Sequence, residues 1–438
     1  MTSQKTNKSS FLPILIIAGL FFIFGFVTWI NGSLIPFMKT INELTVTQSY
    51  FVATASYISF VIMAIPASMV IERLGYKNSM SLGLFIMGLG ALIFIPAANA
   101  RTYWLFLAGI FTQGAGMTLL QTAANPYITI LGPIESAAKR ISIMGITNKV
   151  AGALGALIFG TLLLSGIKEI NEKLATVSGA EKEQLLDTMA HSVVMPYVIM
   201  ASILFVLAVA IRYAPLPHVE PSPIETTEGE VGKTSIFQFP HLWLGVLTLF
   251  VYVGVEVIAV DTISNYGLAL GFSGKTIKAF PTYTLMAMVA TYAAGIVLIP
   301  KYISQATALK ISASLGMVLA ILITQTTGYT SVLLVAMLGI ANALVWPAVW
   351  PLTLKGLGKF TKTASALLIM AIAGGAIIPP TYGWLVDSRT KTLVAEGMEK
   401  ATAVSQATTS GYWILLPLYA IILYYAIAGH KLGLKPTI

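Results

Sequence analysis

The chain has 438 residues, of which 56% are hydrophobic and only 10% are charged, and its formal net charge is +9. Soluble domains carry about 25% charged residues, so this composition excludes an ordinary soluble protein. The absence of cysteine excludes disulfide bonds, thiolate metal sites and cysteine nucleophiles.

Twelve apolar runs are long enough to cross a bilayer, which takes about 20 apolar residues. No stretch between the runs is long enough for a soluble domain of ordinary size. The sequence therefore predicts an all-α membrane protein with twelve transmembrane helices in a lipid bilayer. The expected spans are residues 11–38, 47–71, 80–98, 103–131, 142–166, 193–214, 241–270, 277–300, 305–325, 330–354, 363–386 and 410–429.

The distribution of charge predicts how these spans are oriented. Lys5 and Lys8 precede the first run, and no small-residue cleavage site follows it, so we expect a retained first helix. If the N-terminus lies inside, the polar segments on that side carry nearly all of the excess Lys and Arg, as the positive-inside rule requires. We therefore expect both termini to be cytoplasmic. The net charge then reflects topology, and no nucleic-acid partner is expected.

The chain divides into two similar halves at a polar stretch that carries four prolines and four glutamates without apolar periodicity. Such a composition is typical of a linker. Asn125-Pro126 and Trp350-Pro351 recur about half a chain apart, which indicates duplicated six-helix bundles. Transporters of this plan hold substrate near the membrane midplane between their halves. The predicted domains are an N-terminal bundle at 1–214, a cytoplasmic linker at 215–237 and a C-terminal bundle at 238–438.

Amide side chains on the first and fourth expected helices are candidate sugar ligands. Asn31 lies on the first helix, while Gln121 and Asn125 are four residues apart and share a face of the fourth. Amides donate and accept hydrogen bonds, which suits sugar hydroxyls. Because membrane amides also commonly bond neighbouring helices, that structural alternative stays open for all three residues.

Only three charged residues, Lys149, Glu256 and Asp261, lie well inside the expected spans. A charge in hydrocarbon costs several kcal/mol unless it is paired or faces an aqueous cavity, so such residues usually mark a pathway. Lys149 and its neighbour Asn148 lie on the fifth helix. The Lys149 ammonium is suited to donate to sugar hydroxyls or to fill the place of a cation in the empty site. A structural ion pair with Glu256 or Asp261 is the alternative.

The two acids belong to the seventh expected helix. Glu256 and Asp261 are five residues apart and point about 140° away from each other on a regular helix, so they form one site only if the helix breaks. Gly254 and Gly267 are candidate positions for a break. Asp261 shares a face with Asn265, and such oxygen groups suit Na⁺ or a proton equally well. We expect a cation-coupling site here, with Na⁺ near Asp261, and a purely structural role is the alternative.

The tenth expected helix supplies an aromatic candidate. The duplication makes Trp346 the counterpart of Gln121 in the second half. A tryptophan ring offers an apolar face to sugar C–H groups and an N–H donor. Asn342 lies four residues earlier and shares the same face. We expect both residues to line the sugar pocket, and the alternative for Trp346 is simple packing.

Several of these runs resemble a known family. The segments FGFVTWING at 24–32, QTAANPY at 121–127 and ILGP at 130–133 resemble the fucose permease branch of the major facilitator superfamily. Residues 139–152 and the segment GVEV at 254–257 are similar to the glucose/galactose transporters of that branch. The resemblance covers nearly the whole chain and implies a transporter of two six-helix bundles, with no cofactor and no enzymatic activity.

The resemblance also implies roles for single positions. Asn31 and Asn148 match polar positions of the branch. In fucose-type members an acidic residue on helix one and another on helix four carry the proton, and the motifs align these positions with Gly32 and Gln121 here. Neither side chain titrates, so the fucose-type proton mechanism is not implied, although Gln121 keeps the shape needed to hold a hydroxyl.

Together the sequence predicts a secondary active transporter that imports a monosaccharide of the glucose/galactose type by alternating access. Cation-coupled symport is expected, with Na⁺ favoured over H⁺, and an uncoupled sugar facilitator is the alternative. An intramembrane enzyme is disfavoured because no catalytic set is present, and a receptor because it would not need duplicated six-helix halves. We expect a monomer in the cytoplasmic membrane of a bacterium.

Overall fold

The computed structural model describes residues 11–130, 137–217, 234–299 and 301–434, and in these ranges the regular structure is helical throughout. The all-α prediction is therefore confirmed for this part of the chain. The elements of the first half are α1 (Phe11–Trp29), α2 (Asn31–Ile41), α3 (Val46–Ser49), α4 (Phe51–Leu92), α5 (Phe94–Asn99), α6 (Tyr103–Ile130), α7 (Ala137–Leu164), α8 (Ile167–Leu174), α9 (Gly179–His191) and α10 (Val194–Tyr213).

The second half is also built from long helices with short 3₁₀ turns between some of them. Its α-helices are α11 (Pro240–Asp261), α12 (Ile263–Ala269), α13 (Gly274–Ile277), α14 (Phe280–Leu298), α15 (Gln305–Gln325), α16 (Gly328–Ala343), α17 (Val345–Leu354), α18 (Thr361–Met370), α19 (Gly374–Ala395), α20 (Lys400–Gly411) and α21 (Leu415–Ile427). The 3₁₀ turns are η2 (Ile236–Gln238), η3 (Gly358–Phe360), η4 (Ala371–Ala373), η5 (Tyr412–Ile414) and η6 (Gly429–Lys431).

Eleven helical segments among the described residues are long and apolar enough to cross a membrane, against the twelve spans expected. The difference arises in one segment, Phe51–Asn99, which has 49 residues. A straight helix of that length would measure about 74 Å at 1.5 Å per residue, more than twice the hydrocarbon core. Gly75 interrupts it with φ 73° and ψ 169°, a backbone conformation that glycine adopts without strain. The expected spans 47–71 and 80–98 lie on either side of this glycine.

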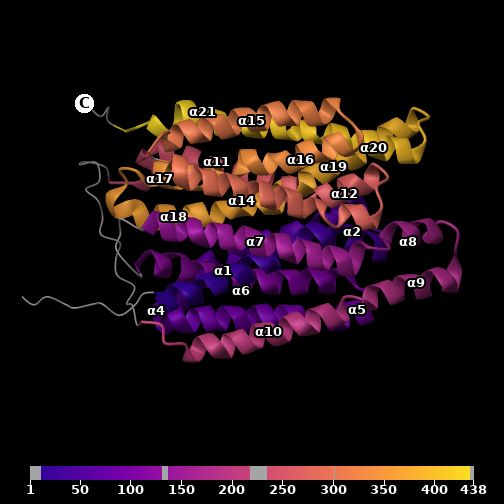
Figure 1. Cartoon of the computed structure of the whole chain (residues 1–438), viewed down its shortest axis with the longest axis horizontal. Helices are drawn as coiled ribbons and strands as arrows, with labels where there is room; N and C mark the ends of the chain where they lie inside the picture. Colours follow the sequence, from indigo (N-terminus) through magenta and orange to yellow (C-terminus); the bar gives the residue numbers. More distant parts are fainter. Residues whose placement is uncertain (1–10, 131–136, 218–233, 300, 435–438) are drawn as a thin grey trace, which may run out of the picture.

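The helices of the two halves lie in two parts of the molecule (Figure 1). Helices α1 to α10 fill the lower part of that view, and most of α11 to α21 fill the upper part. Two hydrogen bonds tie helices across the boundary: Thr54 of α4 donates to the carbonyl of Ala376 at 2.6 Å, and Thr282 of α14 donates to that of Ala153 at 3.0 Å. Pairs α4–α19 and α7–α14 therefore form the boundary between the halves.

Exposed aromatic residues lie toward both ends of the bundle. At the linker end, α10 finishes at Tyr213 and α11 starts at Pro240, and at the opposite α9 end lie α8, α9, α12 and α20 (Figure 1). Large aromatic side chains stand exposed toward both ends, Tyr213 and Phe237 near the linker and Trp104 near α9. Tyr and Trp collect at membrane–water interfaces. The exposed aromatics therefore fit a multi-pass protein whose two ends face water.

A carboxylate from the second half closes the α9 end. Asp387 of α19 accepts hydrogen bonds from the backbone N–H groups of Val46 and Thr47 at 3.1 and 2.7 Å, and from the Thr47 hydroxyl at 2.5 Å. Gly383 permits this approach, because a Cβ there would lie 2.8 Å from the Thr47 Cα. Nearby, the Lys168 ammonium donates to the Gly271 carbonyl at 3.2 Å. These contacts hold the two halves together at this end.

We predict that Asp387→Asn loosens the α9 end, because it replaces a charged acceptor by a neutral one. A hydrogen bond to a charged group is worth about 1.5–3 kcal/mol, and one between neutral groups about 0.5–1.5 kcal/mol. The reporter is Ala376→Cys, a buried interface position that would carry the only thiol of a cysteine-free chain. We expect maleimide to label this thiol about tenfold faster in the Asp387→Asn background. Asp187→Asn, which affects a bond to Arg101 within the first half, is the control and should leave the rate unchanged. Equal rates in all backgrounds would show that Asp387 does not hold this end closed.

Candidate functional site

Three helices of the bundle are interrupted at positions that flank the candidate residues. The first expected span divides at Ile30 into α1 and α2, the seventh at Thr262 into α11 and α12, and the tenth at Leu344 into α16 and α17. Discontinuous membrane helices commonly form binding sites, because their free backbone ends and side chains face an internal cavity. The seventh helix is interrupted at Thr262, directly after Asp261, where the backbone keeps right-handed helical angles (φ −88°, ψ −20°). The expected break at Gly254 or Gly267 is therefore wrong, and no break separates Glu256 from Asp261.

A local hydrogen bond accompanies the break in the seventh helix. The Thr262 hydroxyl donates to the Ile258 carbonyl at 2.7 Å, a bond of the kind that bends helices. The same hydroxyl lies 2.8 Å from the Tyr412 hydroxyl. These contacts fix the end of α11 in the interior, so Asp261 becomes the last residue of a helix in the middle of the protein.

An ion pair joins the two halves in the interior. The Lys149 Nζ of α7 lies 2.7 Å from the Glu256 Oε1 of α11, and the two side chains are 8% and 10% exposed. Of the alternatives that the sequence left open for Lys149, the structure contains the pair with Glu256. Removing one partner of such a buried pair leaves an uncompensated charge and costs about 3–5 kcal/mol. The pair therefore strongly favours the observed contact between α7 and α11.

Asp261 is a second buried acid, and this ion pair does not include it. Its side chain is fully buried, and neither carboxylate oxygen has a hydrogen-bond partner among the described residues. Lys149 and Glu256 are the charged groups that act on it electrostatically. This part of the interior thus holds one ammonium and two acidic side chains, and only Glu256 pairs with the ammonium. An isolated buried carboxylate is unstable unless it takes up a proton or a cation, so this arrangement is suited to bind one.

Further polar groups surround the end of α11. Ser264 and Asn265 are buried on α12, and the Ser264 hydroxyl and the Asn265 NH₂ have no partner in the described part of the chain. Tyr50 of the first half lies beside Asp261 and Asn265. Gly32 of α2 packs on the break itself, because a Cβ at this position would lie 3.5 Å from the Asp261 Cα. The acid is therefore enclosed by residues of both halves.

Three of the predicted sugar ligands are buried asparagines with the same unsatisfied group. Asn31, Asn148 and Asn342 are at most 6% exposed, and the NH₂ of each lacks a partner among the residues that the structure describes. The carbonyl oxygen of Asn148 accepts a bond from Trp29, and that of Asn342 accepts one from Tyr419 at 2.8 Å. A buried donor without an acceptor costs about 1–3 kcal/mol, and a ligand with hydroxyl oxygens would relieve that cost.

The other predicted ligands lie in less buried surroundings. Gln121 is half-buried in an apolar recess that it shares with Leu20 and Phe24. Trp346 stacks on Trp350 with ring centroids 5.3 Å apart. Asn125 is half-buried one turn beyond Gln121. The buried polar residues of α2, α7, α11 and α12 are called the buried polar cluster below. In the described structure, no hydrogen bond links Gln121 or Trp346 to this cluster, so their role in a pocket stays a prediction.

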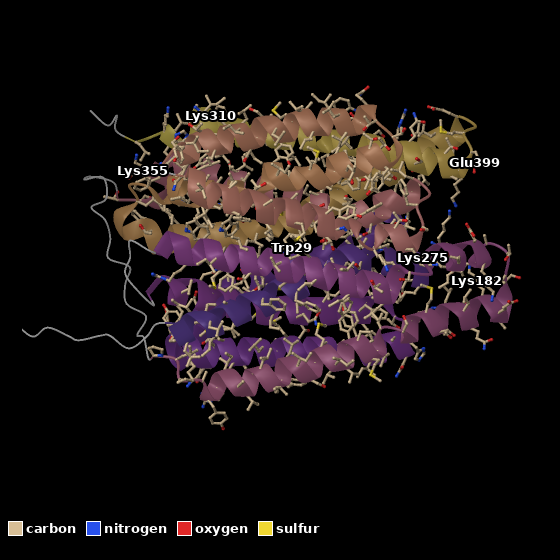
Figure 2. All side chains as sticks on the ribbon, viewed as in Figure 1. Trp29, Lys182, Lys275, Lys310, Lys355 and Glu399 are labelled. Carbon is tan, nitrogen blue, oxygen red and sulfur yellow. The ribbon has the colours of Figure 1, made fainter. Side chains whose placement is uncertain are left out.

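Trp29 is a residue of this region that the sequence analysis did not single out. It lies near the centre of the molecule, whereas the labelled lysines lie toward the ends (Figure 2). Its indole N–H donates to the Asn148 Oδ1 at 3.3 Å, and the Lys149 Nζ lies 4.1 Å from its ring centroid. Tryptophan is enriched at membrane interfaces. The sequence did contain a signal for this residue: it is a tryptophan inside an expected membrane span and away from the interfaces.

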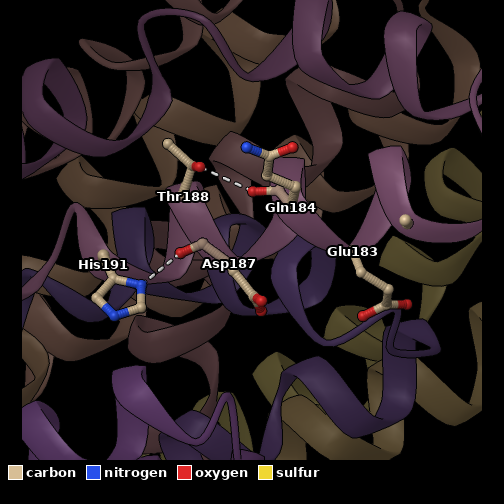
Figure 3. Close-up of a pocket in the computed structure, with 6 residues that line it drawn as sticks. Glu183, Gln184, Asp187, Thr188 and His191 are labelled. Atoms are coloured by element: carbon tan, nitrogen blue, oxygen red, sulfur yellow. Dashed lines mark hydrogen bonds between the residues drawn. The ribbon is translucent and has the colours of Figure 1, made fainter.

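A surface hollow along α9 is a poorer candidate (Figure 3). It is lined by side chains of a single helix, among them Glu183, Asp187 and His191. Arg101 forms ion pairs with Glu183 and Asp187, and the His191 ring bonds the Asp187 carbonyl of its own helix at 2.8 Å. These groups are exposed and satisfied, so the hollow has no chemistry comparable to that of the buried cluster.

The family model of the Major Facilitator Superfamily matches residues 17–388. The chain belongs to the major facilitator superfamily. This membership, together with the apolar helices, makes the protein a multi-pass membrane transporter and not an enzyme. It also confirms the family to which the motifs of the sequence pointed.

Relatives of this superfamily member match along nearly its whole length. The glucose/galactose transporter of Brucella abortus biovar 1 is 31% identical over 442 residues, which cover 98% of this chain and 96% of that protein. The L-fucose-proton symporter of Escherichia coli K12 is 28% identical and covers 87% and 88% of the two chains. A crystal structure of the superfamily transporter FucP in the outward conformation matches with a TM-score of 0.68 at 25% identity, over 96% of this chain and 99% of that one.

We predict that Lys149→Gln lowers the free energy of unfolding by about 3–5 kcal/mol, because Glu256 then remains buried without a partner. The double variant Lys149→Gln/Glu256→Gln should recover most of that loss, since two neutral amides replace the charges. Thermal unfolding in detergent measures both effects. Arg101→Gln, which breaks partly exposed ion pairs, should cost at most about 1 kcal/mol. If the single variant were as stable as the wild type, the pair would contribute nothing to holding the halves together.

Proposed function

We propose that this transporter imports a monosaccharide of the glucose/galactose type by alternating access, coupled to a cation. The observation that carries the proposal is the buried polar cluster where α2, α7, α11 and α12 meet. It combines an unbalanced carboxylate with unsatisfied amide donors, which are the groups that a cation and a polyhydroxylated ligand would satisfy. The relative from Brucella abortus, named a glucose/galactose transporter, supports this choice of sugar.

The proposed architecture has twelve spans in two bundles, at 1–214 and 238–438, with the linker 215–237 in the cytoplasm. The linker end of the bundle is then the cytoplasmic end, and both termini lie on that side. The α9 end faces the outside, so the contacts of Asp387 hold the outer gate closed in this conformation. We propose a monomer in the cytoplasmic membrane of a bacterium.

The sugar would lie between the halves near the helix breaks. Asn31 and Asn148 would donate their free NH₂ groups to hydroxyl oxygens, and Gln121 and Asn125 would bind from the fourth helix. Trp346 of α17 would offer an apolar face to the ring, and Asn342 of α16 would donate its free NH₂. A sugar hydroxyl both accepts and donates, so it matches the mixed character of these amides.

The cation would bind at Asp261, because Lys149 already neutralises Glu256. Ser264 and the carbonyl of Asn265 supply neutral oxygen atoms of the kind that hard cations prefer. Such oxygen atoms suit Na⁺ or a proton. We favour Na⁺ because Gly32 and Gln121 stand where the fucose-type proton carriers are expected, so that proton route is missing. Because the Escherichia coli relative is named a proton symporter, a test has to include both gradients.

We predict that Asp261→Asn abolishes concentrative uptake while sugar exchange persists, because the variant loses the charge that binds the driving cation. The measurement is uptake of labelled glucose, galactose and fucose into proteoliposomes, with a Na⁺ gradient and a pH gradient imposed separately. Asp187→Asn, an exposed acid of α9, is the control and should accumulate sugar normally. Accumulation by Asp261→Asn at the wild-type level would place the coupling site elsewhere. Wild-type uptake that ignores both gradients would favour the uncoupled facilitator.

We predict that Asn31→Ala and Gln121→Ala each raise the sugar KM about tenfold, which is the effect of losing one hydrogen bond of about 1.4 kcal/mol. Initial rates of sugar uptake over a range of concentrations measure the change. Gln113→Ala is the matched control, since Gln113 lies on the same helix as Gln121 but packs against Gly90 of α4. An unchanged KM in both variants would remove these two amides from the pocket.

A further inference from the structure

Trp29 occupies a position from which it contacts both halves of the transporter. It is the last residue of α1, directly before the break at Ile30, and it is 3% exposed. Its ring packs in a cluster with Val260, Leu285 and Met288 of the second half. Val260 is the neighbour of Asp261 in the sequence. Trp29 therefore lies beside the break in helix seven as well as beside the ion pair.

One face of α7 forms a seat for the indole. Gly152 lies four residues after Asn148 and three after Lys149, so it is a neighbour of each on the helix surface. Gly152 makes room for the ring, because a Cβ there would lie 2.8 Å from the Trp29 Cγ and would overlap the ring. The ring thus rests on the helix between two polar side chains, and it touches both of them.

The contact with Asn148 determines which end of the amide is free. The indole N–H is only a donor, so the atom it meets at 3.3 Å must be the carbonyl oxygen of Asn148. The NH₂ then points away from Trp29 and has no partner among the described residues. Trp29 therefore presents Asn148 as a donor to whatever binds in the site.

The contact with Lys149 restricts where the ammonium can lie. The Nζ is held 4.1 Å from the ring centroid and 2.7 Å from Glu256. Asp261 is the other buried acid of α11, and a lysine side chain is flexible enough to exchange one carboxylate for another. An aromatic face binds a cation through its quadrupole, and this attraction retains the ammonium on the Glu256 side.

We propose that Trp29 is a positioning residue that holds Lys149 on Glu256 and thereby leaves Asp261 free for the coupling cation. The same ring orients Asn148 toward the sugar. The inference rests on the proposed function, since it assigns the cation to Asp261. It predicts that the contact of Trp29 with Asn148 controls the affinity for sugar, and that the contact of Trp29 with Lys149 controls the affinity for the cation.

Two substitutions separate these contacts. Trp29→Phe keeps an aromatic face over Lys149 but lacks the N–H. We expect it to raise the sugar KM about tenfold while the half-saturating cation concentration changes less than about twofold. Trp29→Leu loses both contacts, so Lys149 also reaches Asp261 and competes with the cation. We expect the half-saturating cation concentration to rise about fivefold or more, with a smaller effect on the maximal rate.

The experiment is an equilibrium titration of purified protein with NaCl at constant ionic strength, and separately with acid, followed by the change in protein fluorescence and by thermal stabilisation. Sugar transport in proteoliposomes supplies the KM values. Trp104→Leu, a change of an exposed tryptophan, is the control for loss of an indole. In a Lys149→Gln background, Trp29→Leu should no longer change the cation affinity, since the effect acts through Lys149.

The outcomes separate the positioning role of Trp29 from the proposed cation coupling at Asp261. If the wild type binds a cation in an Asp261-dependent way and Trp29→Leu binds it equally well, the positioning role is overturned and the proposed coupling stands. If Trp29→Leu does not fold, an unchanged sugar KM in Trp29→Phe overturns the orientation of Asn148. If the wild type binds neither Na⁺ nor a proton at Asp261, the proposed coupling fails and this inference falls with it.

Discussion

The structure depends on how three buried charges are balanced in a medium that does not screen them. One ammonium and two carboxylates lie in the interior, and the ammonium is committed to Glu256 at 2.7 Å. The carboxylate of Asp261 is left fully buried without a hydrogen-bond partner in the described structure. Several kcal/mol are at stake for such a group. An imbalance of this kind would make the site dependent on a bound positive charge, as the proposed cation coupling requires.

The position of the ion pair relative to the other contacts between the halves suits alternating access. Thr54, Thr282 and Asp387 all make hydrogen bonds across the boundary, and those of Asp387 lie at the α9 end. The bonds at that end are only partly buried, so water can take over these bonds when the end opens. The Lys149–Glu256 pair is buried, and water cannot replace either partner. A rocking motion would therefore break the outer contacts first and use the buried pair as its pivot.

The sequence predicted most of the fold and part of the site, for identifiable reasons. Apolar runs of membrane length and the motifs of the family are local signals, so the helices and the family could be found without a structure. An ion pair was one of the roles that the sequence left open for Lys149. Two acids of the same helix were possible partners, so the sequence alone did not select Glu256. The break after Asp261 and the contacts of Asp387 and Trp29 could not be predicted. They depend on how neighbouring helices are rotated about their axes, which local patterns do not encode.

The close packing at Gly32 bears on how many unpaired acids the site can hold. The resemblance to fucose-type permeases implies an acidic residue at this position of helix one. In this protein a Cβ at residue 32 would lie 3.1 Å from the Val260 carbonyl oxygen and 3.5 Å from the Asp261 Cα. A carboxylate there would crowd the break in helix seven and add a third negative charge against a single ammonium. The glycine instead lets α2 approach the break closely. In the proposed coupling, the acid at Asp261 of helix seven would therefore lie directly beside the helix-one position where the resemblance implies an acid.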